Sequence, residues 1–302
     1  MKPVHIDTSL CSGCGLCVVV CPYKALNLED GVARYVIDDC FCCGHCHAVC
    51  PEDAIVVGTL SFSAVEIVEE CTAAASPLTK EQDLSTAALV SFMAARRSCR
   101  NYSERQVPVK VLEDLVQVGI TAPSGTNCQP WQFIILPERS DLFHFGTLVG
   151  NYFRKLNRLA GNRVLRFVTR FFSGGGLAGY YEKHYHSVQE GLESWDNRGE
   201  DRLFHGAPAA ILVTALKKAS CPGEDAMLAT QNILLAAHAM GLGTCLIGFA
   251  VEAVRRDGGI RKRLAIPESE EIYAVIVLGY PKVSFLRPAG RKKVQARILR
   301  FG

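Results

Sequence analysis

The chain has 302 residues, of which 49% are hydrophobic and 21% charged, and its formal net charge at pH 7 is +3. This length indicates two domains, and the hydrophobic fraction is ordinary for a globular protein. The small net charge gives no reason to expect nucleic-acid binding. No stretch approaches the ~20 uninterrupted apolar residues that a membrane span requires, so we expect no transmembrane segment.

The chain begins with two copies of one cysteine pattern, C-x2-C-x2-C-x3-C-P. The first copy is Cys11, Cys14, Cys17 and Cys21 before Pro22, and the second is Cys40, Cys43, Cys46 and Cys50 before Pro51. This spacing is typical of two [4Fe–4S] clusters, where the fourth cysteine of each run ligates the other cluster. The pattern therefore predicts one cluster on Cys11, Cys14, Cys17 and Cys50, and another on Cys40, Cys43, Cys46 and Cys21.

Structural zinc is the alternative interpretation of these cysteines, because C-x2-C pairs also bind zinc. A zinc site takes two separated pairs, however, and not a run of four that ends in Cys-Pro. Disulfides are less expected, since no apolar signal segment follows Met1-Lys2-Pro3. Cys42 lies between two predicted ligands and is interpreted as a spare. The remaining cysteines are scattered singly and are interpreted as reduced thiols, so we expect a cytoplasmic protein.

Residues 1–60 are predicted to form a small ferredoxin-like domain. Each cysteine run is followed by a short hydrophobic piece, 25–28 and then 54–57, which we expect to be a strand. Residues 61–84 include Cys71-Thr-Ala-Ala-Ala-Ser-Pro, which has the composition of a linker.

Residues 85–302 are predicted to form a second, α+β domain. Helices are expected at about 85–97, with Ser85 as the N-cap, at about 108–122, and at 224–240 before Gly241. Strands are expected at 131–136, 209–214 and 272–278, and the last is apolar throughout, as a strand buried on both faces would be. The tail, 281–302, is basic and has no clear periodicity.

Residues 150–205 stand apart because basic and apolar side chains alternate there. A basic amphipathic helix can lie on a membrane or meet an acidic partner. We favour a helical lid inserted in the second domain, with Gly174-Gly175-Gly176 as a hinge. Three histidines and three tyrosines of this stretch are candidate proton donors, although surface residues are the simpler interpretation: His184, His186, His205, Tyr180, Tyr181 and Tyr185.

Three polar segments of the second domain are candidates for cofactor binding. Arg96-Arg97-Ser98-Cys99-Arg100 offers guanidinium groups, which suit bidentate binding of phosphate; a surface charge cluster is the alternative. Residues 122–131, Ala-Pro-Ser-Gly-Thr-Asn-Cys-Gln-Pro-Trp, offer amides and hydroxyls in a turn-rich loop. Gly290-Arg291-Lys292-Lys293 offers further cations.

Together these segments resemble the flavin-binding nitroreductase family over about residues 85–300. The Gly241-Leu242-Gly243 turn, followed by Ile247-Gly248-Phe249, adds to the likeness. With the cysteine runs included, the chain resembles a ferredoxin–nitroreductase fusion. The resemblance implies FMN bound at the interface of an intertwined homodimer.

Site residues follow from the resemblance, position by position. It implies that Arg96, Ser98 and Arg100 contact the FMN phosphate and ribityl chain, that Arg97 lies near the ring edge, and that Arg291 and Lys293 complete the phosphate site. Pro123, Ser124, Gly125 and Asn127 would reach the isoalloxazine from the other subunit, and Leu246, Ile247 and Gly248 would place backbone against the ring. Arg202 is a weaker candidate for a cation near the flavin. Many members have Glu where Ile247 stands, so a nicotinamide or substrate contact of that Glu is in doubt here.

The implied function is that of an oxidoreductase. Two [4Fe–4S] clusters would pass electrons from a low-potential donor protein to FMN, for two-electron reduction of a small acceptor such as a nitroaromatic, a quinone or an activated alkene. One alternative is a flavoprotein that oxidises NAD(P)H and passes electrons out through the clusters. Another is a non-catalytic electron-transfer or redox-sensing subunit.

Overall fold

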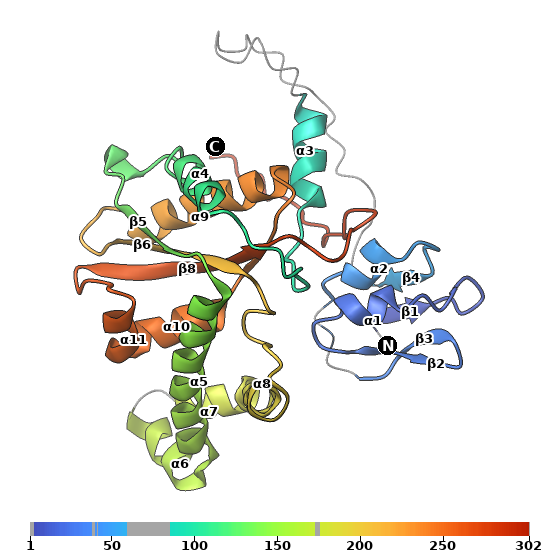
Figure 1. Cartoon of the computed structure of the whole chain (residues 1–302), viewed down its shortest axis with the longest axis horizontal. Helices are drawn as coiled ribbons and strands as arrows, with labels where there is room; N and C mark the ends of the chain where they lie inside the picture. Colours follow the sequence, from blue (N-terminus) through green and yellow to red (C-terminus); the bar gives the residue numbers. More distant parts are fainter. Residues whose placement is uncertain (1–2, 38–39, 41, 59–84, 173–175, 302) are drawn as a thin grey trace. The chain divides into compact units, whose positions relative to one another are not determined.

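The computed structural model describes residues 3–37, 40, 42–58, 85–172 and 176–301 (Figure 1). The predicted linker 61–84, with Cys71, lies outside these ranges, as do two glycines of the predicted hinge. The chain divides into two compact units, Met1–Arg96 with Val283–Gly302, and Arg97–Lys282. This division differs from the predicted boundaries, because residues 85–96 and the C-terminal segment group with the first unit.

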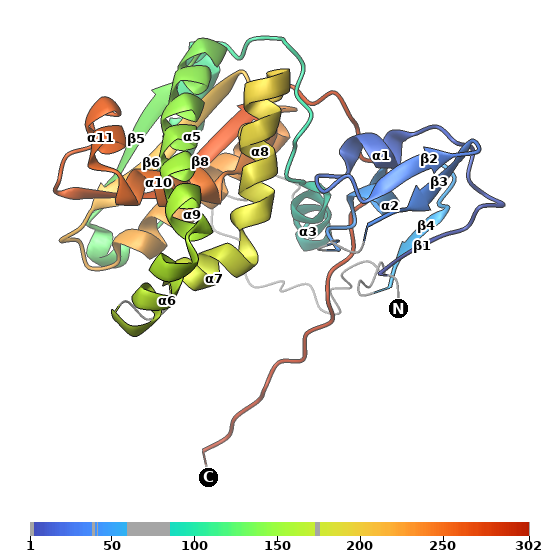
Figure 2. The ribbon, with the colours of Figure 1, turned by 90° about the horizontal axis from the view of Figure 1, so that it is seen from below.

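The first unit is built from two similar halves (Figure 2). Strand β1 (Val4–Ile6) pairs with β4 (Ile55–Val57), and β2 (Leu26–Glu29) pairs with β3 (Val32–Tyr35), both antiparallel. The helices α1 (Leu16–Val20) and α2 (His45–Val49) each follow a glycine, Gly15 and Gly44, with φ of 73°. Such a left-handed turn favours glycine, and it reverses the chain between the third cysteine of each run and the two before it. The strands expected at 25–28 and 54–57 are present as β2 and β4.

A segment from the far end of the chain completes the core of this unit. Val283 and Phe285 pack against a cluster that includes Val20, Leu26 and Ile55. The Leu286 amide donates to the Ala48 carbonyl at 2.9 Å. Helix α3 (Thr86–Ala95) also belongs to this unit; the Ser85 hydroxyl caps it by accepting from the Ala88 amide at 3.1 Å.

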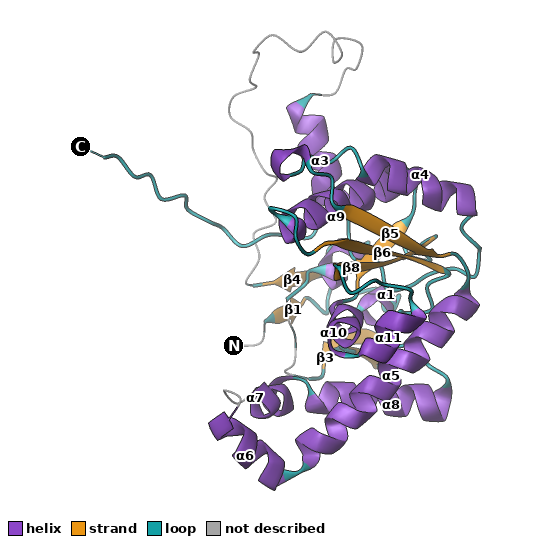
Figure 3. Cartoon of the chain, turned by 90° about the vertical axis from the view of Figure 1, so that its left-hand side faces the viewer, coloured by secondary structure: helices purple, strands orange, loops and turns teal. Residues whose placement is uncertain are grey.

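The second unit is an antiparallel sheet covered by helices on both faces (Figure 3). Its strand order is β5-β6-β8-β7. The strands are β5 (Trp131–Leu136), β6 (Ala209–Leu216), β7 (Gly243–Leu246) and β8 (Glu270–Gly279). The helices are α4 (Val109–Gly119), α5 (Arg139–Gly161), α6 (Arg163–Phe172), α7 (Gly176–Lys183), α8 (Tyr185–Arg198), α9 (Pro222–Ala239), α10 (Gly248–Arg256) and α11 (Gly258–Arg263), with a 3-10 turn at Gly125–Asn127.

Strand β6 supplies a core on each face of the sheet. Ala210 and Leu212 join one cluster with side chains of α5, α10 and α11, whereas Ile211 and Val213 join another with α4 and α9. Successive strand residues point to opposite faces, so a strand covered on both faces is apolar throughout. This accounts for the continuous apolar runs of β6 and β8, and the predicted α+β class is confirmed by the observed mixture of elements.

The predicted insertion, 150–205, contains helices in its described part up to Arg198, and a turn follows them. Its first helix, α5, begins earlier, at Arg139, and buries Leu142, Phe145 and Val149 in the core. Helix α6 turns its apolar side outward, since Val164 and Phe167 are 68% and 64% exposed. Arg166 instead faces the protein: its guanidinium lies 3.8 Å from the centre of the Tyr181 ring and donates to the Ala160 carbonyl.

A search of the described helices finds none with the length and hydropathy needed to cross a membrane.

Candidate functional site

The structure brings cysteines of the two runs close to one another. Burial raises the pKa of the Cys17 thiol to about 11, and the neighbouring groups that raise it further are Cys14, Cys11 and Cys50. Burial likewise raises the pKa of Cys46 to about 12, with further contributions from Cys43, Cys21 and Cys17. Each fourth cysteine therefore neighbours the opposite run.

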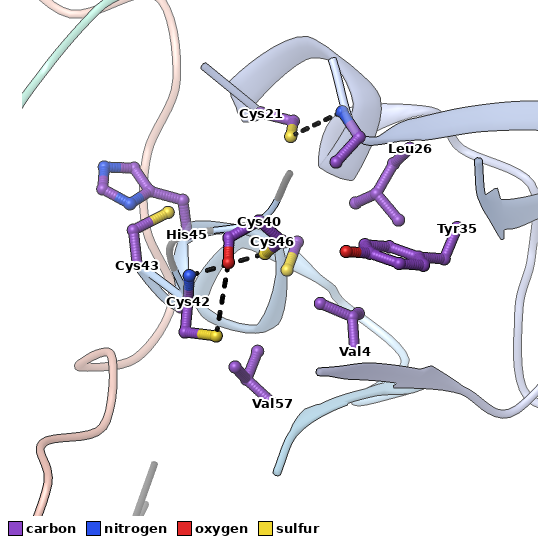
Figure 4. Close-up of a pocket in the computed structure, with 12 residues that line it drawn as sticks. Val4, Cys21, Leu26, Tyr35, Cys40, Cys42, Cys43, His45, Cys46 and Val57 are labelled. Atoms are coloured by element: carbon purple, nitrogen blue, oxygen red, sulfur yellow. Dashed lines mark hydrogen bonds between the residues drawn. The ribbon is translucent and has the colours of Figure 1, made fainter. Parts of the chain in front are cut away.

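A pocket in the first unit gathers the second predicted ligand set (Figure 4). Its lining includes Cys21, Cys40, Cys43 and Cys46, together with apolar Val4 and Val57. The hydroxyl of Tyr35, another lining residue, is directed toward Cys46 in Figure 4. Cys42 also lines the pocket, but its thiol donates to the Cys40 carbonyl at 3.7 Å, as suits a cysteine that is not a ligand.

Backbone amides around the cysteines fit thiolate ligands. The amides of Ala25, Ala33 and Ala54 donate to the sulfur atoms of Cys21, Cys11 and Cys50 at 3.2, 3.4 and 3.4 Å. Such hydrogen bonds stabilise negative sulfur and tune an iron–sulfur cluster. The raised pKa values belong to metal-free thiols; bound iron replaces the proton and supplies the positive charge that burial requires.

In the second unit, the arginine segment lies along the edge strand β7. Ser98 forms an isolated β-bridge with Thr244, and the Cys99 amide donates to the Thr244 carbonyl at 2.8 Å. A Cβ added at Gly243 would lie 2.6 Å from the Cys99 Cβ, so this close approach requires glycine. Residues 97–100 are thereby fixed beside the strand that leads to Leu246, Ile247 and Gly248.

Arg100 carries a buried nitrogen with no acceptor. Its Nη1 is shielded from solvent and has no hydrogen-bond partner among the described residues. A guanidinium never gives up its charge, and leaving a buried charged donor unsatisfied is unfavourable. The position therefore fits an anionic group such as a phosphate.

His205 lies beside Arg100, although the sequence favoured a surface histidine. Burial, followed by the charges of Arg100 and Arg202, lowers its pKa to about 4, so the ring is neutral at pH 7. The turn that carries it is fixed by Asp201, whose carboxylate accepts from the amides of Phe204 and Gly206 at 2.8 and 3.0 Å. An Asp whose side chain accepts from nearby backbone amides is typical of a turn, but it gives no indication of the distant Arg100.

The polar loop 122–131 is fastened by Asp225, a residue that sequence reasoning missed. This buried carboxylate accepts from the Gly125 amide at 2.9 Å and from the Cys128 thiol at 3.6 Å. Within the loop, Ser124 Oγ accepts from the Gln129 amide at 3.0 Å. An acidic residue in a first helical turn is common for electrostatic reasons, so the sequence alone could not assign Asp225 this contact.

The loop and the arginine segment lie at opposite edges of the sheet in one chain. The loop leads into β5, the arginine segment borders β7, and β6 and β8 lie between them. Three strand spacings separate the two edges by roughly 14 Å. One chain therefore does not bring Ser124 or Asn127 to Arg100.

The remaining predicted flavin residues are distributed as follows. Ile247 is buried and its amide donates to the Val275 carbonyl at 2.9 Å, while Leu246 is exposed and Gly248 begins α10. Arg96, Arg291 and Lys293 belong to the first unit. The Arg291 side chain donates to the carbonyls of Ala289 and Gly290, and the role of these cations at a phosphate stays a prediction.

Comparison with known proteins identifies both parts of the chain. The nitroreductase family model matches residues 93–280, more than half of the chain, and the 4Fe-4S binding domain model matches residues 4–27. The chain therefore belongs to the nitroreductase family. It is an oxidoreductase that also carries an N-terminal 4Fe–4S binding domain.

Individual relatives agree with this assignment. A 4-nitrobenzoate reductase of Nocardioides is 29% identical over 209 residues, which cover 63% of this chain and 79% of the relative. An NADH dehydrogenase of Thermus thermophilus is 27% identical over 206 residues, covering 66% and 87%. A nitroreductase of Desulfitobacterium hafniense, solved with bound FMN, has a TM-score of 0.50 and 22% identity, covering 69% of this chain and 96% of that one. At this identity the structural likeness concerns the fold alone.

Proposed function

We propose that the protein is an FMN-dependent oxidoreductase in which two [4Fe–4S] clusters serve the flavin and the substrate is a small two-electron acceptor. The clusters would supply single electrons, and FMN would supply two-electron reduction of a nitroaromatic, a quinone or an activated alkene. The observation that carries the proposal is the proximity of cysteines from the two runs, since Cys50 lies near Cys17 and Cys21 lies near Cys46, on a chain of the nitroreductase family.

In this proposal the cysteines act as two ligand sets. Cys11, Cys14, Cys17 and Cys50 hold one cluster, and Cys40, Cys43, Cys46 and Cys21 hold the other. The amides that donate to Cys11, Cys21 and Cys50 favour the reduced state, because they stabilise added negative charge.

The flavin site in this proposal is shared by two chains. Ser98 and Arg100, with Arg96, Arg97, Arg291 and Lys293, bind the phosphate and ribityl chain, and residues 246–248 support the ring. The polar loop comes from a second copy of the chain, which supplies Pro123, Ser124, Gly125 and Asn127. The separation of these two groups at opposite sheet edges supports a homodimer, since neither group completes the site alone.

A second candidate keeps the FMN but reverses the electron flow. The relative from Thermus is named an NADH dehydrogenase, which favours NAD(P)H as the donor and the clusters as the exit. Many family members have Glu where this chain has Ile247. The isoleucine cannot make the polar contact to such a donor that a Glu carboxylate could make.

The two candidates are separated by turnover of 4-nitrobenzoate in anaerobically purified protein. With reduced methyl viologen as a one-electron donor, turnover should require the clusters, so Cys14→Ser should abolish most of it. Cys42→Ser is the matched control in the same run and should keep it. Turnover that needs NADH and is equal in both variants would reject the proposed electron flow from the clusters to FMN.

A further inference from the structure

The first unit contains a segment that the chain supplies after the whole nitroreductase unit. We call residues 283–291 the C-terminal strap. Phe285 meets the His45 ring edge-on, with ring centres 5.3 Å apart, and Leu286 hydrogen-bonds to Ala48. Both contacts fall on α2, one on each side of Cys46 in the second run, and Figure 4 shows the strap as the pale red ribbon beside His45.

Arg287 of the strap holds the backbone of a predicted cluster ligand. Its Nη2 donates to the Cys50 carbonyl at 3.0 Å, and its Nη1 donates to the Asp53 carboxylate. The arginine side chain is 28% exposed and Asp53 is 65% exposed. The Cys50 sulfur, on the other side of the same residue, accepts from the Ala54 amide. A fixed cation and its counter-ion therefore both lie close to the backbone of this predicted ligand.

We propose that the C-terminal strap is a working part of the ferredoxin-like unit, and that Arg287 raises the reduction potential of the cluster that Cys50 ligates. Reduction by dithionite adds one electron, and so one negative charge, to a cluster. A guanidinium fixed on the ligand's carbonyl stabilises that added charge, and groups that hold ligands in place tune a metal centre in this way. The Asp53 carboxylate opposes the effect, because it carries the same sign as the added charge.

This inference needs the clusters and Cys50 as a ligand, but not the direction of electron flow proposed above. It also predicts opposite effects for two neighbouring substitutions, which a merely structural contact would not produce.

The test is an anaerobic redox titration of the full-length protein, with reduced clusters followed by electron paramagnetic resonance. Arg287→Gln should lower one cluster midpoint and Asp53→Asn should raise it, while the double variant should return close to wild type. Arg297→Gln removes a charge from an exposed position of the same tail and should leave both midpoints unchanged. Midpoints that stay unchanged in both single variants, or that shift in the same direction, would overturn the proposal.

If Arg287→Gln fails to retain its clusters, Arg287→Lys, which keeps the positive charge, is the second variant that tests the proposal. If Arg287→Lys retains its clusters, its cluster midpoint potential should stay close to that of wild type, because the side chain keeps its positive charge. Suppose instead that Arg287→Lys lowers the midpoint potential, relative to wild type, by as much as Asp53→Asn raises it. This result would also contradict the role of the charge.

Discussion

At the scale of single residues, the proposed flavin site depends on Arg100, and His205 lies beside that arginine. Among the described residues, Arg100 has a buried guanidinium nitrogen without an acceptor. The neighbouring histidine stays neutral because burial, and after it the charges of Arg100 and Arg202, lowers its pKa. The arginine motif could be predicted from the sequence because its residues are contiguous. His205 and Asp225 could not, because each acts on a partner about 100 residues away.

Arg100→Gln should weaken FMN binding by about 10- to 100-fold, since a hydrogen bond to a charged group contributes about 1.5–3 kcal/mol. Equilibrium dialysis or flavin fluorescence measures the dissociation constant. Arg105→Gln is the matched control, because Arg105 is an exposed arginine that lies over the Tyr280 ring; its affinity should be that of wild type. Equal affinities in the two variants would remove Arg100 from the site.

His205 predicts a loss of stability in mild acid. Its pKa in the folded protein, about 4, is below its ordinary value of 6.5, so the unfolded chain binds the proton more readily as the pH falls. Between pH 7.5 and 5.5 this difference removes about 1 kcal/mol of stability. Thermal unfolding at the two pH values should show a smaller acid loss in His205→Gln than in wild type.

The exposed His144 serves as the control for that measurement. His144→Gln should retain the pH dependence of wild type, because its ring lies at the surface and bonds to the Ser140 carbonyl. If His205→Gln and wild type lose stability in parallel, the lowered pKa of His205 is wrong.

At the scale of elements, the long helices and strands could be predicted from local sequence pattern. Elements that depend on long-range contacts could not. Strand β5 was predicted at its observed bounds, and α9 within two residues at its N-terminal end and one at its C-terminal end. Strand β7 was not predicted, because Gly243-Thr244-Cys245-Leu246 has no strong strand pattern and its pairing with β8 fixes it. The sequence also predicted an amphipathic α6 but not that its apolar side faces outward, since orientation depends on what its cations contact.

Gly243→Ala tests how the arginine segment is fixed to β7. The added Cβ would meet Cys99 at 2.6 Å, and overpacking of this kind destabilises by about 1–3 kcal/mol. We expect a melting temperature lower by about 2–10 °C, together with weaker FMN binding. Gly191→Ala in α8 is the control, because nothing lies within 4 Å of its added Cβ. A Gly243→Ala variant with wild-type FMN affinity would contradict the proposed dependence of the site on this contact.

At the scale of the whole molecule, the crossed ligand sets stay a prediction from the cysteine spacing, whereas the position of the C-terminal tail could not be predicted from the sequence. Residues 283–302 have no periodicity, yet they group with the first unit, because Val283 and Phe285 bury apolar surface there. The sheet order likewise could not be predicted from the sequence, and it is the sheet order that separates the two halves of the proposed flavin site.

A site shared between chains predicts complementation. Arg100→Gln and Asp225→Asn should each lose FMN, the first at the phosphate and the second by loosening the loop. In a mixed dimer, one site combines the intact Arg100 of one chain with the intact loop of the other. Random pairing should therefore restore about a quarter of the flavin sites, measured as FMN bound per chain after the two variants are mixed and refolded or produced together. No recovery would argue for a site within a single chain.

The most direct test of the proposed link between clusters and flavin is the rate at which the flavin is reduced by a one-electron donor. In this experiment the protein is mixed anaerobically with reduced methyl viologen in a stopped-flow instrument, and cluster and flavin absorbance are followed together. Wild type is compared with Cys14→Ser, a substitution at an exposed cysteine. Intramolecular delivery raises effective concentration by orders of magnitude, so flavin reduction should follow cluster reduction and should slow by about 100-fold in the variant. Flavin reduction at the same rate in both proteins would contradict a path through the clusters.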